Sequence, residues 1–220
     1  MMKPLIVSLL LLSVPVTSYA DSALIKDCSE VFGKPSACKV IRCSDRHQKF
    51  IGTWQGPFSS YSRELSNESN SIFRPFNNTV TYSEEDCLEN VENGDSFIMG
   101  RRTDVYPEFE GLPGKTVKGL LVTGRKKDGT LFLRTVDEEN GICDFKLEYR
   151  NLLAGMTVWS FVVPESDFSP AMRFTTIDAQ DQTMASELRM NVTVTMSIGP
   201  ADAPYWEGVV TKGYHALSAR

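Results

Sequence analysis

The sequence predicts a mainly β protein, an antiparallel meander barrel of about 8–10 strands with a short N-terminal helix. Short segments of alternating apolar and polar residues follow one another from Phe50 onward, without long helical patterns between them. Turn-forming pairs, Asp128-Gly129 and Asn140-Gly141, separate several of these segments. Closing the sheet into a barrel removes its two exposed edges, although a sandwich of the same strands is the alternative.

The strand predictions rest on alternation, because successive side chains of a strand point to opposite faces. In segment 191–198 every second residue is apolar, and segment 142–149 repeats the pattern with Cys143 and Phe145 on its apolar face. Among the segments after Phe50, only 178–190 has helical character. The first strand is expected near 50–58, and the remaining ones are expected at 71–82, 96–103, 117–124, 130–136, 156–163, 171–178 and 205–214.

The first twenty residues have the pattern of a secretory signal peptide. Lys3 precedes an apolar run from Pro4 to Val16, and the small residues Ser18 and Ala20 fit a cleavage site. The run is shorter than the about 20 residues of a membrane helix, and a membrane anchor is the alternative. We therefore expect a signal peptide (1–20), an N-terminal helix and cysteine-bearing connector (21–49) and a single β-barrel domain (50–220). The mature protein would be periplasmic or secreted, with no integral membrane span.

The predicted N-terminal helix rests on an apolar stripe. Its members recur at intervals of three and four residues, and they are Leu24, Ile25, Cys28, Val31 and Phe32. Gly33 and Pro35 would end the helix.

Five cysteines follow the predicted signal peptide, and export makes disulfides the expected state. The candidates for disulfides are Cys28, Cys38, Cys43 and Cys87, with one short bridge among the first three, although spacing does not indicate which pair forms. Cys143 is expected to face inward as the free thiol. A metal site of Cys38, Cys43 and His47 is the alternative, but their spacing is unlike that of structural zinc sites, so no metal is predicted.

Charge and motifs exclude several function classes. The net charge is −5 and no basic stripe occurs, which argues against a nucleic-acid partner. The chain lacks the nucleophile-elbow, P-loop, dinucleotide-binding and zinc-protease motifs. The acidic runs at 84–86 and 137–139 are expected to be solvated loops. We therefore favour a protein without enzymatic activity, with an enzymatic barrel as the alternative.

The segment FIGTWQGPF contains a Gly-x-Trp triplet at the start of the predicted barrel. Five residues fall on one face if it is a strand: Phe50, Gly52, Trp54, Gly56 and Phe58. Glycines beside Trp54 leave room for its indole and permit strong coiling of the strand. These residues are therefore expected to close one end of the barrel.

On these residues the chain resembles the lipocalins and the wider calycin group. The resemblance consists of Gly52 and Trp54, the preceding helical segment and the signal peptide. Lipocalins also have a later Thr-Asp-Tyr motif. A similar stretch here is Arg102-Thr103-Asp104-Val105-Tyr106, in which Val105 interrupts the motif. The resemblance implies a small apolar ligand in the barrel mouth. A fainter resemblance, to nitrobindin-like haem barrels, lies at Gly52-Thr53-Trp54 and Gly56. It implies that His215 binds a haem. The residue pattern itself predicts that His215 is a surface histidine near the chain end.

The candidate ligand-lining residues are the large side chains of the later strands. They are Trp159, Phe161, Met172, Phe174, Trp206 and Tyr214. Ordinary core packing is the alternative explanation for them. The function that the sequence favours is binding of a small hydrophobic ligand by an exported, lipocalin-like barrel. The alternatives are an envelope structural or interaction protein with a solid barrel core, and a haem-binding or enzymatic barrel.

Overall fold

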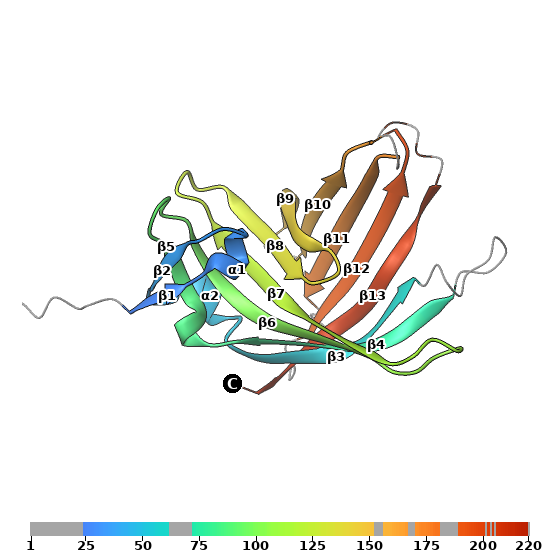
Figure 1. Ribbon diagram of the computed structural model, residues 1–220, viewed down its shortest axis with the longest axis horizontal. Helices are drawn as coiled ribbons and strands as arrows, with labels where there is room; N and C mark the ends of the chain where they lie inside the picture. The colour runs from blue at the N-terminus through green and yellow to red at the C-terminus, as the bar shows by residue number, and fades with distance from the viewer. Residues whose placement is uncertain are drawn as a thin grey trace, which may run out of the picture.

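The computed structural model describes residues 24–61, 72–151, 156–166, 170–180, 189–200, 202, 204 and 206–219 (Figure 1). Ten of the described strands form one closed antiparallel barrel, which confirms the predicted fold class. They are β3 (Gly52–Tyr61), β4 (Phe73–Tyr82), β6 (Ser96–Tyr106), β7 (Lys115–Arg125), β8 (Leu131–Asp137), β9 (Gly141–Asn151), β10 (Met156–Val163), β11 (Met172–Gln180), β12 (Arg189–Ile198) and β13 (Trp206–Ala219).

The barrel is a meander, because each of these strands pairs antiparallel with the one before it and β13 returns to pair with β3. Closure leaves no free edge among these ten strands. Each predicted strand coincides with an observed one to within a few residues at its ends. Of the segment predicted as helical, 178–190, the two ends belong to β11 and β12, and 181–188 lie outside the described residues, as does the predicted signal peptide.

The N-terminal part contains short elements that the alternation pattern did not indicate. They are β1 (Ile25–Asp27), α1 (Ser29–Phe32), β2 (Ala37–Val40), α2 (Asp45–Gln48), η1 (Glu84–Asp86) and β5 (Cys87–Asn90). The predicted helix is present as the single turn α1, but its expected beginning is wrong, because residues 25–27 pair with β2 as a strand. So short a helix is marginal in isolation, and pairing with β2 satisfies the same backbone groups.

Strands β1, β2 and β5 form a side layer that extends the sheet from one edge of β6. The first half of β6 pairs with β5 and its second half pairs with β4. With α1, the side layer covers the outer face of β6–β8 (Figure 1). Val31, Leu88 and Phe97 are almost fully buried there, and the rings of Phe32 and Phe97 meet edge to face at 5.8 Å. This part of the molecule therefore has a hydrophobic core outside the barrel.

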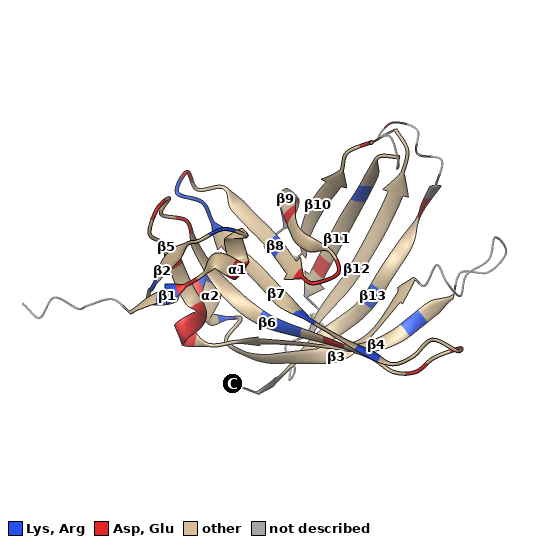
Figure 2. Cartoon of the chain, in the orientation of Figure 1, with Lys and Arg blue, Asp and Glu red and all other residues tan. Residues whose placement is uncertain are grey.

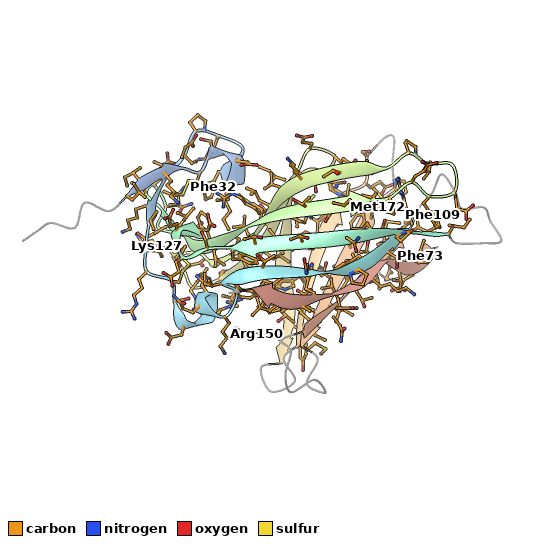
Figure 3. The ribbon with its side chains drawn as sticks, turned by 90° about the horizontal axis from the view of Figure 1, so that it is seen from below. Phe32, Phe73, Phe109, Lys127, Arg150 and Met172 are labelled. Atoms are coloured by element: carbon orange, nitrogen blue, oxygen red, sulfur yellow. A yellow bond between two sulfur atoms is a disulfide. The ribbon has the colours of Figure 1, made fainter. Side chains whose placement is uncertain are left out.

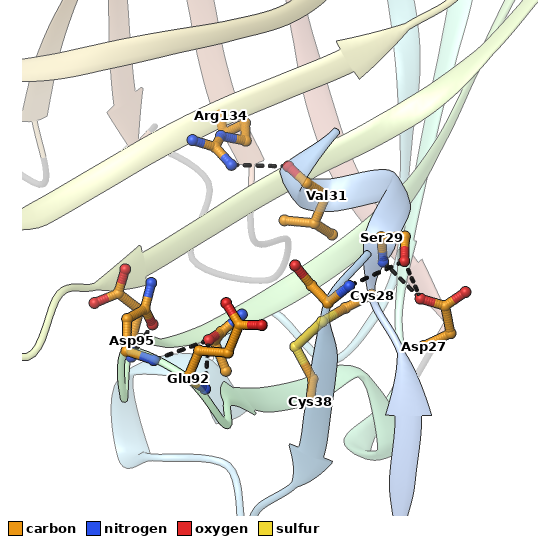
Figure 4. Close-up of a disulfide and its surroundings, with 11 residues drawn as sticks. Asp27, Cys28, Ser29, Val31, Cys38, Glu92, Asp95 and Arg134 are labelled. Carbon is orange, nitrogen blue, oxygen red and sulfur yellow. Dashed lines mark hydrogen bonds between the residues drawn. A yellow bond between two sulfur atoms is a disulfide. The ribbon is translucent and has the colours of Figure 1, made fainter. Parts of the chain in front are cut away.

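Two disulfides hold the N-terminal segment, and together they use the four predicted cysteines. Cys28–Cys38 closes the β1–β2 turn (Figure 4), and Cys43–Cys87 joins the connector to β5. Cys143 is the free cysteine. The alternative metal site is wrong, because Cys38 and Cys43 belong to two different disulfides.

Residues 41–51, including α2, plug one end of the barrel, which we call the closed end. Ile41, Phe50 and Ile51 pack there against inward-facing side chains that include Trp54 and Tyr82. Figure 3 shows Phe32 and Lys127 toward the closed end, whereas Phe73, Phe109 and Met172 lie at the opposite end, which we call the loop end. The plug restricts any interior space to the part of the barrel beyond it.

Charged residues of both signs are spread over the strands and turns (Figure 2). No described helix has the length and apolar character needed to cross a membrane.

Candidate ligand-binding site

The barrel encloses a cavity of about 700 Å³, to which all ten barrel strands contribute side chains. Most of its wall is apolar. The aromatic side chains that line it are Phe50, Trp54, Phe58, Phe76, Tyr82, Tyr106, Phe145, Trp159, Phe161 and Phe174. A concave, mostly apolar space of this size with a few polar groups is typical of small-molecule sites.

Four of the six residues predicted to line a ligand site face this cavity: Trp159, Phe161, Met172 and Phe174. Phe161 and Phe174 are cross-strand partners with ring centroids 6.2 Å apart. Phe145 of β9 approaches Phe161 at 5.6 Å, so three neighbouring strands present one aromatic surface to the cavity.

The other two predicted residues lie on β13. Tyr214 is absent from the cavity lining, where β13 contributes Thr211 and His215. An irregularity in the pairing with β12, between Val194 and Thr195, shifts the alternation along β13. This shift explains why counting every second residue from Trp206 selected Tyr214. Of Trp206 itself the structure describes only the backbone, which pairs with Ile198.

Among the five residues predicted to close the barrel, Phe50, Trp54 and Phe58 line the cavity. Phe50 precedes β3 and lies in the turn after α2, where its carbonyl accepts a hydrogen bond of 2.8 Å from Trp54 Nε1. The φ of Gly52 is 125°, a region that side chains disfavour. A Cβ at Gly56 would lie 1.8 Å from the carbonyl oxygen of Tyr214. Glycine at this position therefore permits the close approach of β13 to β3.

A row of hydrogen-bonded polar residues crosses the cavity wall, and we call it the polar belt: His215, Asn78, Asp104, Arg102 and Asp137. Asn78 Nδ2 donates to Asp104 Oδ1, and Asn78 Oδ1 therefore faces His215 Nε2. Since that oxygen can only accept, His215 must carry its proton on Nε2. Burial lowers the pKa of His215 to about 4, which keeps its imidazole neutral at neutral pH.

Arg102 pairs with both carboxyl groups of the belt. Its Nη2 donates to Asp137 Oδ2 at 2.7 Å, and its Nε lies 3.4 Å from Asp104 Oδ2. Burial raises the pKa of Asp104, while Arg102 opposes that shift. One guanidinium is thus shared by two buried carboxyl groups.

Two glycines allow the belt to span strands that are not adjacent. The register places Gly56 between His215 and Asn78, and Gly119 between Arg102 and Asp137. Neither glycine has a side chain to separate its neighbours.

Two of the sequence-based expectations for these residues were wrong. His215 is not a surface residue, because it lies within β13, faces the cavity and has Phe58 against its ring at 4.8 Å. The acidic runs are not uniformly solvated, since Asp86 and Asp137 are only 2% and 7% exposed. Asp86 accepts from Arg101, and Asp137 belongs to the polar belt. Both carboxylates acquire a partner from β6 that a linear pattern does not indicate.

Asp178 of β11 is a cavity-lining carboxyl near the closed end. Its cross-strand neighbours are Thr157 and Val192. Among the described residues, none forms a hydrogen bond or ion pair with it. Burial raises the pKa of Asp178 to about 7. Burial raises the pKa of Tyr82, and the charge of Asp178 adds to that rise. The side chains of Asp178 and Tyr82 therefore lie in the same region of the cavity.

Haem ligation through the Nε2 atom of His215 does not fit these residues, because that atom is already hydrogen-bonded. An axial histidine must direct a free ring nitrogen at the iron. The Nε2 atom of His215 is bound to Asn78, and the ring packs against Phe58. Binding iron through Nε2 would break the polar belt.

Comparison of the chain with protein-family models, with curated proteins and with solved structures found no match. The likeness to lipocalins therefore consists of a closed antiparallel barrel and the Gly-x-Trp of its first strand. The ten strands here exceed the about eight of a lipocalin barrel.

Proposed function

We propose that this protein is an exported, lipocalin-like binding protein that holds a small, largely apolar molecule inside its barrel. The observation that carries the proposal is the cavity of about 700 Å³ with its aromatic wall. Its volume lies within the about 300–1,000 Å³ of pockets that bury small ligands. Two disulfides are typical of proteins that fold in an oxidising compartment, which supports export.

The wall and the polar belt have different parts in this proposal. Contact with Trp159, Phe161 and Phe174 removes apolar ligand surface from water, which stabilises a complex by about 25 cal/mol per Å². The belt offers hydrogen-bonding groups at fixed positions, which orient a ligand rather than hold it by area alone.

The alternatives have less support from the described residues. A solid barrel core requires a packed interior, whereas the barrel contains a large cavity. Nucleophilic catalysis requires a base within reach of the nucleophile, and Nε2 of His215 is not that base, because it carries the ring proton and donates it to Asn78. Binding is therefore the favoured function.

A pair of neighbouring threonines on β11 provides a test with a matched control. Thr176 lines the cavity, and Thr175 is absent from its lining. Thr176→Trp fills part of the cavity, so we expect it to weaken binding of the neutral dye nile red by about tenfold or more. Fluorescence titration measures this affinity.

Thr175→Trp makes the same chemical change on the other face of the strand and should leave the affinity within about twofold of wild type. Absence of dye binding to the wild type, or equal loss in both variants, would contradict the proposal.

A further inference from the structure

Among the cavity-lining carboxyl groups, Asp178 is the one without a hydrogen-bond or ion-pair partner in the described part of the chain. Asp104 and Asp137 share Arg102, and Glu139 accepts a hydrogen bond of 2.7 Å from Lys115. Among the described residues, Asp178 has no cationic or hydrogen-bonding partner. An ionised carboxylate held away from water without a partner is costly, so this position favours a cation supplied from outside the chain.

The second cavity-lining guanidinium, that of Arg46, does not supply this charge. No ion pair joins it to Asp178, and its strongest electrostatic neighbours are Arg125 and Arg150. Both of these arginines are exposed. Arg46 therefore lies near other cations and forms no ion pair with Asp178, which stays without a partner among the described residues.

Aromatic rings lie on the same part of the wall as Asp178. Trp159 is two residues from Thr157, the cross-strand partner of Asp178, and it shares the cavity-facing side of β10. Tyr82 lines the cavity near Asp178, and its ring packs beside Phe50 at 5.7 Å. Faces of aromatic rings attract cations through their quadrupole. A carboxylate beside such rings forms a site with two independent attractions for an ammonium group.

On these grounds we infer that the ligand is an amphipathic amine, whose ammonium group pairs with the Asp178 carboxylate while its apolar body contacts the aromatic wall. This inference rests on the proposed binding function and specifies its ligand class. A charge-assisted hydrogen bond to Asp178 is stronger than a neutral one. It also removes the cost of a half-buried carboxylate without a partner, so an amine gains more at this site than an alcohol of the same shape.

Three compounds with the same aromatic body test the inference: phenethylamine, phenethyl alcohol and phenylacetate. Calorimetric titration of the wild-type protein should give an affinity for the amine at least about tenfold higher than for the alcohol, with phenylacetate weakest. Asp178→Asn keeps the shape of the side chain. It should lower the affinity for the amine about tenfold and leave the affinity for the alcohol within about threefold of wild type. Binding of nile red to the variant shows that the cavity is retained.

Glu207→Gln is the matched control, since Glu207 is an exposed carboxylate of β13 outside the cavity lining. It should leave all three affinities unchanged. Equal binding of the three compounds, or an unchanged amine affinity in Asp178→Asn, would overturn the amine assignment and leave apolar binding intact. Preference for phenylacetate would overturn it in favour of a site at Arg46. Failure of nile red and all three compounds to bind would overturn both proposals.

Discussion

Asp178 and His215 both face the barrel cavity, and burial shifts their pKa values in opposite directions. The pKa of Asp178 rises from 3.8 to about 7, and that of His215 falls from 6.5 to about 4. In both cases burial favours the neutral form. His215 has Asn78 as a hydrogen-bond partner, whereas Asp178 has none among the described residues. The cost of burial is therefore concentrated at the position where we place the ligand's charge.

The raised pKa of Asp178 makes the stability of the unliganded protein depend on pH. The folded state binds the proton more tightly than the unfolded state, so the stabilisation is present below pH 3.8 and is lost as pH rises to about 7. Relative to wild type, Asp178→Asn should gain up to about 4 kcal/mol in the free energy of unfolding between pH 4 and pH 8. Urea denaturation at several pH values measures this difference.

Taking the difference between variant and wild type cancels the opposite contributions of His47 and His215, whose lowered pKa values reduce stability as pH falls from 6.5 to about 4. Thr157 of β10 and Val192 of β12, the cross-strand neighbours of Asp178, do not titrate. Tyr82 of β4 stays protonated over this pH range, because burial and the charge of Asp178 raise its pKa. A difference that stays constant over this pH range would show that Asp178 is ionised in the folded protein throughout.

At the scale of elements, the N-terminal segment determines how the barrel is closed and covered. Residues 41–51 plug the closed end, and the side layer of β1, β2 and β5 covers the outside of β6–β8. Arg134 adds a hydrogen bond of 2.8 Å from its Nη1 to the carbonyl of Val31, which fastens α1 to β8. The two disulfides restrict different parts of this segment, and their removal should have unequal effects.

Cys43–Cys87 spans 44 residues and Cys28–Cys38 spans 10. A longer loop loses more entropy when it is closed in the unfolded chain. Replacing Cys43 and Cys87 by serine should therefore lower the free energy of unfolding by about 1 kcal/mol more than replacing Cys28 and Cys38. Equilibrium denaturation of the two double variants compares them directly. A larger loss from Cys28 and Cys38 would indicate that the side layer, not the plug, limits stability.

At the scale of the whole molecule, the sequence predicts the barrel well because alternation is a local signal. Segments such as 191–198 carry it in full, and Asp128-Gly129 marks a turn directly. The short strands β1, β2 and β5 were not predicted, because they are too short to show alternation and depend on pairing with other segments. Trp159 and Phe174 were found as cavity residues by their size and alternation.

The polar part of the site is harder to predict. Asn78, Asp104 and Arg102 meet only when strands distant in sequence are adjacent, and the gaps at Gly56 and Gly119 decide which side chains touch. Asp178 is marked in the sequence as a carboxylate in a predicted strand, but its isolation depends on the neighbours that the fold supplies. An acidic residue on the inward face of an apolar strand is the signal that could have revealed it.

The central claim is that the barrel carries a small molecule in its cavity. Mass spectrometry under non-denaturing conditions, applied to protein purified from its native source, tests it most directly. The account predicts a mass above that of the disulfide-bonded chain, and an organic extract that contains an apolar compound with a basic nitrogen. The bare mass of the chain, together with no uptake of nile red by the same preparation, would contradict it.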